Sequence, residues 1–149
     1  LSVFFQWSYG NDVLNANRLF FDSGFQKKRE LNQYASYTNR WTPENPNSDI
    51  PAATNSSSNL VISSRVVEDA SFLRLKTVTL GYTVPKTFLK KYKIDNARLY
   101  VAAQNLWTIT GYSGYDPEVS MRSGGLTPGR EFSSYPRALS VSFGINLGF

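Results

Sequence analysis

The sequence predicts an all-β fold, in which antiparallel strands form the C-terminal part of a large transmembrane β-barrel. The first observation is the alternation over residues 139–149, where every odd position is apolar and every even position is Ser, Gly or Asn. Successive side chains of a strand point to opposite faces, so this strand has one apolar and one small polar face. Its length suits a tilted strand that crosses a bilayer. The second observation is that no run of apolar residues is long enough for a transmembrane helix.

The composition excludes several kinds of chemistry. The 149 residues include no Cys and no His, which rules out disulfides, Cys-based zinc sites and Ser-His-Asp catalysis. The net charge of +5 is spread along the chain, except at Lys27-Lys28-Arg29 and Lys90-Lys91. Such scattered bases form no stripe for nucleic acid, and they favour a solvated face or contact with anionic lipid. We therefore expect no nucleic-acid partner, and we also predict no cofactor and no enzyme activity.

The chain opens on a strand pattern over residues 1–10. Leu1, Val3, Phe5 and Trp7 share one face, and Phe4 is the exception on the polar face. Trp and Tyr at one end of a strand are typical of a membrane interface. Because the chain starts inside a strand and not at an initiator Met, we expect it to be the C-terminal piece of a longer protein.

Two further strands are predicted at residues 72–84 and 97–110. In the first, alternation is clear from Val78 onward, but upstream Arg74 and Lys76 fall on the same parity as Val78. Either these two bases lie at the level of the outer lipid headgroups, or a bulge near Lys76 exchanges the two faces. In the second strand, Asn105 breaks the alternation, which suggests that the strand leaves the apolar band there.

The connections between the strands alternate in length. Residues 11–68 form a long polar segment, with room for one or two short helices before residue 40, three prolines in 40–51 and a low-complexity tip at 55–59. Residues 85–96 form a short connection with one possible helical turn, and 111–137 form a second long loop. Counted back from the C-terminus, both long loops lie on one side, as in a bacterial barrel whose C-terminus is periplasmic. Four strands cannot close a barrel, so partner strands are expected upstream.

Several ordered motifs make the sequence more specific. They are Arg40-Trp41-Thr42-Pro43-Glu44-Asn45-Pro46, Glu68-Asp69-Ala70-Ser71-Phe72-Leu73-Arg74-Leu75-Lys76, Thr79-Leu80-Gly81-Tyr82-Thr83-Val84-Pro85, Ala103-Gln104-Asn105-Leu106-Trp107-Thr108 and Gly111-Tyr112-Ser113-Gly114-Tyr115-Asp116-Pro117-Glu118. Together with the terminal aromatic strand, they resemble the C-terminus of the SusC/RagA family of TonB-dependent outer-membrane transporters. The resemblance covers nearly the whole chain.

The resemblance implies a barrel of about 22 strands in the outer membrane of a Gram-negative bacterium, with an N-terminal plug. It also implies energy supplied through the TonB complex and a SusD-like surface lipoprotein that closes the barrel as a lid. Substrates are oligosaccharides in many members and peptides in others. The plug, the segment that contacts TonB and the first strands of the barrel would lie upstream of Leu1.

Candidate contacts to substrate or lid lie on the two outward loops. Trp41, Tyr112 and Tyr115 can stack on sugar rings or contact the lid, although aromatic residues at these positions can equally pack the loops together. Asp116 is a further polar candidate, but its spacing from Glu118 suits a turn better than a catalytic carboxylate pair. Asp12, Asp22 and Asp49 lack the spacing of a calcium loop, and we expect no metal site.

The terminal strand carries a second kind of signal. Its apolar row matches the terminal pattern that barrel-assembly machinery recognises, and the same side chains are expected to face lipid: Val141, Phe143, Ile145, Leu147 and Phe149.

Three functions remain open from the sequence. The first is active import of a nutrient by a TonB-dependent transporter, to which this segment contributes strands and outward loops. The second is a passive porin-like or structural barrel, and the third is a secreted carbohydrate-binding β-sandwich. The exposed apolar row of residues 141–149 argues against the third.

Overall fold

The computed structural model of the 149-residue chain describes residues 1–24, 32–54, 60–118 and 129–149. The chain divides into two compact units, which we describe separately. The strand unit consists of Leu1–Tyr9, Phe72–Thr110 and Arg137–Phe149, and the loop unit of Gly10–Ser71 and Gly111–Pro136. Among the described residues, no helix is both long enough and apolar enough to cross a membrane.

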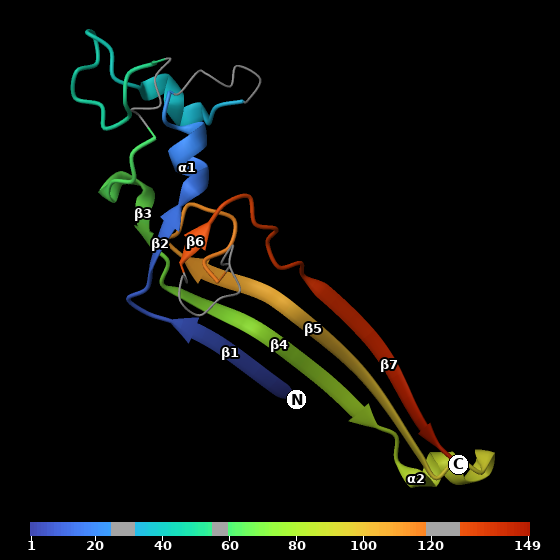
Figure 1. Ribbon diagram of the computed structural model, residues 1–149. Coiled ribbons are helices and arrows are strands. Elements are labelled where there is room, and N and C mark those ends of the chain that lie inside the picture. Colours follow the sequence, from blue (N-terminus) through green and yellow to red (C-terminus); the bar gives the residue numbers. More distant parts are fainter. Residues whose placement is uncertain (25–31, 55–59, 119–128) are drawn as a thin grey trace. The chain divides into compact units, whose positions relative to one another are not determined.

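The strand unit is a four-stranded antiparallel sheet in the order β1-β4-β5-β7 (Figure 1). The strands are β1 (Ser2–Ser8), β4 (Phe72–Thr83), β5 (Asn96–Thr110) and β7 (Ser140–Gly148). Each lies within or one residue beyond a range that the sequence predicts. Because β1 and β7 are the outer strands of the sheet, each pairs along one side only.

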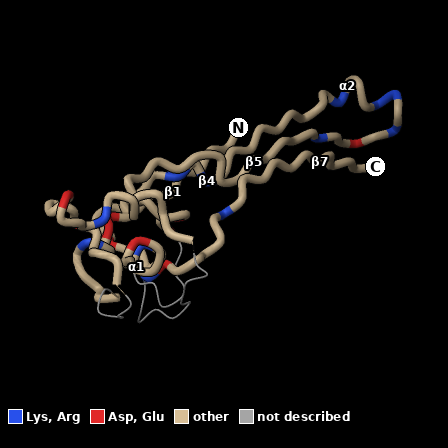
Figure 2. The backbone as a smooth tube through the Cα atoms, turned by 90° about the horizontal axis from the view of Figure 1, so that it is seen from above, with Lys and Arg blue, Asp and Glu red and all other residues tan. Residues whose placement is uncertain are grey.

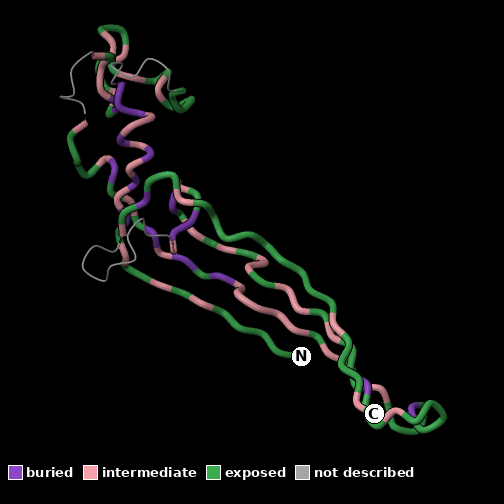
Figure 3. The backbone as a smooth tube through the Cα atoms, turned by 45° about the vertical axis from the view of Figure 1, so that its right-hand side comes forward, coloured by how far each residue is buried: buried purple, intermediate pink, exposed green. Residues whose placement is uncertain are grey.

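Strand register sorts the side chains of this sheet onto an apolar and a polar face. On the apolar face, Leu80 of β4 pairs with Val101 of β5, and Val101 in turn pairs with Phe143 of β7. Much of the outer strands β1 and β7 is exposed (Figure 3). Most of the large apolar side chains of the strands are exposed as well, and the exposed fraction of Phe143 is 79 %. Ser and Gly of β7 occupy the opposite face. The sheet therefore exposes the side chains that a water-soluble sheet would bury.

A bulge explains the confused pattern around Lys76. Leu75 pairs with Trp107, whereas Thr77 pairs with Gln104, so that β5 has one residue more than β4 across this point. Asn105 adopts a φ of 52°, a left-handed conformation that Asn tolerates better than most residues. Across the bulge the faces of β4 are exchanged, so that Leu75 and Leu73 share the apolar face with their partners Trp107 and Ile109. The apolar face of β5 continues past Asn105 through the exposed Trp107 and Ile109, and the expectation that the strand leaves the apolar band near Asn105 stays a prediction.

Arg74 consequently lies on the polar face and not among lipid headgroups. It is buried at 3 % exposure, its Nε donates to Thr108 Oγ1 at 2.9 Å, and its guanidinium lies 5.5 Å from the ring centre of Phe72. Of the two accounts that the sequence allows, the structure has the bulge.

Small residues on the polar face make room for long side chains of β5. A Cβ at Gly144 would collide with the ring of Tyr100, its cross-strand partner, and a Cβ at Gly81 would lie 2.9 Å from the guanidinium of Arg98. The close approach of the Tyr100 ring thus favours Gly at position 144, whereas the guanidinium beside Gly81 is the end of a flexible side chain that can move.

The short connection between β4 and β5 is a helical hairpin. It contains the helical turn α2 (Lys86–Leu89) and the 3-10 turn η4 (Lys90–Tyr92), and it ends at Lys93 with a left-handed φ of 56°. The Asp95 backbone N–H donates to Gly148 O at 2.8 Å, which fixes the connection to the end of β7.

The loop unit has more regular structure than the sequence predicts. Its sheet has the order β3-β2-β6, in which β2 pairs antiparallel with β3 and parallel with β6. The elements are β2 (Asp12–Asn15), α1 (Ala16–Phe21), η1 (Ala35–Asn39), η3 (Ser64–Val66), β3 (Val67–Asp69) and β6 (Arg130–Glu131). The three short strands lack the length that makes alternation visible. The low-complexity tip at 55–59 and the basic cluster at 27–29 lie outside the described residues.

Candidate functional site

The site is built around the start of α1, where Asn15 ends β2 and caps the helix. Its side-chain Oδ1 accepts a hydrogen bond from the Arg18 backbone N–H at 3.2 Å. Asn is among the preferred N-cap residues because its side chain satisfies a backbone donor that the helix leaves free. The cap places the Asn15 amide and the Arg18 guanidinium beside β3.

Glu68 on β3 joins these two side chains to the second long loop. Its Oε1 accepts from Asn15 Nδ2 at 3.2 Å and Arg18 Nη1 at 3.2 Å, and its carboxylate also accepts from the Ser113 backbone N–H at 3.0 Å and Ser113 Oγ at 2.9 Å. Burial raises the pKa of Glu68, but the hydrogen bonds from Ser113 and Arg18 outweigh it, and the net pKa is lowered. Glu68 is therefore an ionised anchor at neutral pH.

Asp22 closes the other end of α1. It is fully buried, and its carboxylate accepts from Arg65 Nη1 at 3.3 Å and from Ser36 Oγ at 3.0 Å. Arg18 lies one turn away, with Nη2 at 3.8 Å from Asp22 Oδ2. Two arginines thus neutralise Asp22 and Glu68, and a buried carboxylate needs such partners.

These residues border a recess of about 450 Å³, which we call the polar recess. Its lining residues come from three segments of the loop unit: Asn15, Arg18, Tyr34, Ser36 and Ser113. Burial, reinforced by nearby Tyr115 and Glu131, raises the pKa of Tyr34, so its hydroxyl keeps its proton. Hydroxyl, amide and guanidinium groups with balanced charge suit hydrogen bonding to a polar solute, and no lining residue is an activated nucleophile.

A buried cluster supports the same unit from the β6 side. Glu131 has no exposed surface, and its carboxylate accepts from the Tyr112 hydroxyl and from Asn17 Nδ2, the latter at 3.2 Å. Asn17 in turn accepts from the Ser133 backbone N–H at 2.9 Å. Burial, with the hydrogen bond to Glu131, raises the pKa of Tyr112 far above its usual range. We call Glu131, Tyr112, Asn17 and Ser133 the Glu131 cluster.

Comparison with known proteins places this arrangement in context. The chain is 36% identical over its full length to the TonB-dependent receptor P3 of Formosa agariphila, of which it covers 15%. It is 29% identical to the TonB-dependent receptor SusC of Bacteroides thetaiotaomicron, over 87% of this chain and 14% of that protein. A solved structure of the RagAB peptide transporter matches 99% of this chain and 15% of that one, at 33% identity and a TM-score of 0.78. No protein-family model matches.

The chain belongs to the SusC/RagA family of TonB-dependent receptors. It spans about 15% of the length of the relatives that it matches. The sheet of the strand unit is accordingly part of the transmembrane β-barrel of a TonB-dependent receptor, as the sequence predicts. These relatives are named as receptors and transporters, which at the level of the family supports the prediction that the chain is not an enzyme.

The four predicted contact residues on the loops fall into two pairs. Tyr112 is only 6 % exposed and packs with Val13 and Ala70, as in the packing alternative, and its contact with substrate or lid stays a prediction. Asp116 is buried as well, and its Oδ1 accepts from the Glu118 backbone N–H at 3.0 Å, the hydrogen bond of a turn. Both residues stabilise the loop unit from inside.

The other two candidates are exposed and stay predictions. Trp41 is 42 % exposed and Tyr115 is 62 % exposed. The polar recess itself was missed, because its residues are individually ordinary and distant in the sequence. The one available signal was Asn15 followed by a short helix, which predicts a cap but not a recess.

The apolar row of the terminal strand is exposed throughout, and its contact with lipid and assembly machinery stays a prediction. The row is Val141, Phe143, Ile145, Leu147 and Phe149. Within residues 1–24, 32–54, 60–118 and 129–149, no group of three His, Cys, Asp or Glu side chains is placed to hold a metal ion.

Proposed function

We propose that the chain forms wall strands and outward loops of an active importer in the outer membrane of a Gram-negative bacterium. The importer takes up oligosaccharides or peptides, is energised through the TonB complex, and works with a SusD-like surface lipoprotein as its lid. The observation that carries the proposal is the sheet whose exposed apolar face runs along all four strands in a chain of this family. A lipid-facing barrel wall has this pattern.

In this proposal the loop unit provides the surface that contacts substrate or lid. In this arrangement both long loops lie outside the cell, and Trp41 and Tyr115 are exposed aromatic side chains on them. Exposed aromatic residues are preferred anchors in protein interfaces and on sugar rings. The polar recess adds hydrogen-bond donors nearby in the same unit. The named relatives include a peptide transporter, which supports peptides as one substrate class.

The two alternatives are distinguished from the importer in different ways. A secreted β-sandwich would bury the apolar row of β7, whereas Phe143 and Ile145 are 79 % and 64 % exposed. A passive barrel shares the same wall and differs in needing neither TonB nor a lid, so uptake experiments separate it from the importer.

The test uses the full-length receptor in its own cells. Membrane fractionation and a gel with and without boiling check for a closed barrel, and uptake of labelled peptide and oligosaccharide pools is then measured with and without TonB and the lid lipoprotein. We expect a heat-modifiable outer-membrane protein whose uptake of one pool requires both partners. A soluble protein, or uptake that ignores TonB and lid, would contradict the proposal.

Matched variants then test the loop residues. We expect Trp41→Ala or Tyr115→Ala to reduce uptake roughly tenfold, as for an interface anchor worth about 1–2 kcal/mol. Tyr92→Ala is the control, because Tyr92 is an exposed aromatic residue, at 68 %, on the short connection between β4 and β5, which the proposal places on the opposite, periplasmic side. Equal uptake by all three variants would remove Trp41 and Tyr115 from it.

A further inference from the structure

The connection between β4 and β5 concentrates positive charge at one end of the sheet. Its four lysines, Lys86, Lys90, Lys91 and Lys93, are exposed, and Asp95 is the acidic residue among them. Figure 2 shows these lysines gathered beyond the ends of the strands. Four positive charges and one negative charge give this short hairpin a net charge of +3.

Helical geometry separates the hairpin into a basic and an aromatic edge. Lys86 and Lys90 are four residues apart, so they lie on one side of the turn, and together they line a recess of about 470 Å³. Phe88 and Tyr92 are also four residues apart and are 70 % and 68 % exposed. Lysines beside exposed aromatic rings are typical of segments at a membrane interface.

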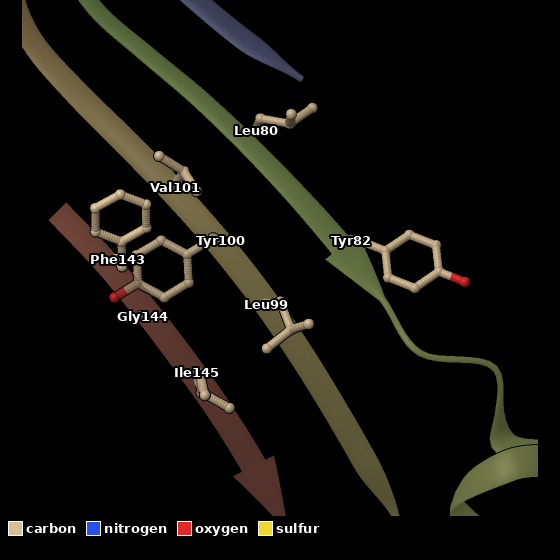
Figure 4. A pocket seen from close by; sticks show the side chains of 8 residues that line it. All are labelled: Leu80, Tyr82, Leu99, Tyr100, Val101, Phe143, Gly144 and Ile145. Carbon is tan, nitrogen blue, oxygen red and sulfur yellow. The ribbon is translucent and has the colours of Figure 1, made fainter. Parts of the chain in front are cut away.

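An apolar groove lies toward the same end of the strands, and its nearest residue on β4, Tyr82, precedes Lys86 by four residues. It has a volume of about 490 Å³ and crosses three strands, with Leu80 and Tyr82 of β4, Leu99 and Val101 of β5, and Phe143 and Ile145 of β7 on the apolar face, and with Tyr100 and Gly144 completing its lining. Figure 4 shows Leu80, Val101 and Phe143 at one level along the strands and Tyr82, Leu99 and Ile145 at the next, as their pairing requires.

The groove and the lysines are separated by the depth of one lipid leaflet. Lys86 follows Leu80 by six residues, which is roughly 20 Å of extended chain. For a strand tilted by about 45° this corresponds to a depth of roughly 14 Å, about half of a hydrocarbon core of about 30 Å. A lipid whose chain lies in the groove would therefore place its headgroup at the depth of Lys86 and Lys90.

We propose that the groove and the recess of Lys86 and Lys90 form one binding site for an anionic glycerophospholipid of the periplasmic leaflet. The acyl chain occupies the groove, and the phosphodiester binds the two ammonium groups. Asp95, which also lines the recess, offsets one lysine and leaves a single positive charge for a single phosphodiester. This inference rests on the proposed function only in taking the sheet as barrel wall, with the short connection on the periplasmic side.

The test is a lipid titration of the purified full-length receptor with its lid in detergent. Phosphatidylglycerol and phosphatidylethanolamine with the same acyl chains are added, and bound lipid is counted by native mass spectrometry. We expect preferential binding of phosphatidylglycerol, weakened about thirtyfold by the double variant Lys86→Gln/Lys90→Gln, since each lysine near an anionic headgroup is worth about 1 kcal/mol.

A second double variant, Lys91→Gln/Lys93→Gln, removes the same charge from the same hairpin outside the recess. We expect it to weaken binding less than about threefold. Val101→Trp, which fills the groove, should weaken binding of both lipids without changing their ratio. Equal loss in the two lysine variants, or equal binding of the two lipids by the wild-type receptor, would overturn the proposal.

The barrel itself is checked on the same samples. A heat-modifiable shift in every variant shows that the wall is intact, so a failed lipid preference then counts against the lipid site alone. Loss of the shift in the wild-type receptor would count against the barrel and hence against the proposed function.

Discussion

The two units of the chain differ in which side chains they leave exposed. In the strand unit most of the large apolar residues are exposed, and among its buried side chains is the charged Arg74. In the loop unit Asn15, Asn17 and Glu131 are among the most completely buried side chains. The strand unit gains by the transfer of its exposed apolar side chains from water into an apolar surrounding phase, whereas the loop unit also depends on hydrogen bonds between buried polar side chains. A substitution should therefore have opposite consequences in the two units.

The largest expected effect is a charge on the apolar face of β7. Phe143→Arg would place a guanidinium in lipid, at a cost of about 2–4 kcal/mol that depends on depth. We expect the full-length receptor to lose most of its heat-modifiable form in outer-membrane fractions. The measurement is the folded fraction on an unboiled gel.

The neighbouring position provides the control for this prediction. Ser142 lies on the opposite, polar face, where its cross-strand partner is Ala102. Ser142→Arg adds the same side chain to the same strand, and we expect it to leave the folded fraction nearly unchanged. Equal losses from both variants would mean that the two faces of β7 meet the same environment.

A smaller and more local effect is expected in the loop unit. Glu131→Ala leaves the Tyr112 hydroxyl and the Asn17 amide without the acceptor that both use. An unsatisfied buried polar group costs about 1–3 kcal/mol, so we expect local opening of the loop unit to become easier by about 2–4 kcal/mol. Hydrogen exchange of β2 and β6, followed by mass spectrometry, measures this change.

Glu44 provides the matched control, because it is an exposed glutamate of the same unit. Glu44→Ala should change exchange in β2 and β6 by no more than the measurement error. Exchange in β4 and β5 should stay unchanged in both variants. A Glu131→Ala protein with wild-type protection would show that the Glu131 cluster does not stabilise the loop unit.

The same contrast decides what the sequence could predict. The strands were predictable because the exposed row from Val141 to Phe149 repeats at a period of two over a full strand length. A bulge in β5 was not predictable, because a lone Asn105 among strand residues allows either the end of the strand or a left-handed residue inside it.

In the loop unit, β2, β3 and β6 are too short for any period to appear. Residues that bond to each other in this unit, such as Asn17 and Glu131, lie more than a hundred residues apart in the sequence. Composition indicated that Tyr112 and Asp116 were available for contact, whereas tertiary packing used them inside the unit. Hydrogen bonds between distant polar residues leave no periodic signal, so the polar recess could only be found in three dimensions.

The smallest expected effect is a pH dependence confined to the loop unit. The fold lowers the pKa of Glu68 below its ordinary value of 4.5, so the charged form binds its partners better than the neutral form does. A carboxylate with a lowered pKa stabilises the fold above the unfolded pKa, and this contribution is lost as the pH falls below about 4.5 through the folded value.

Pulse-labelling hydrogen exchange after incubation between pH 6 and pH 3, with the pulse at one fixed pH, should show β3 opening in acid. Glu68→Gln keeps an acceptor but cannot titrate, so β3 should open more readily at pH 6 and lose much of its response to acid. If the variant kept the full acid response of the wild type, another carboxylate would be responsible, and Glu68 would hold Arg18 and Ser113 by hydrogen-bond geometry alone.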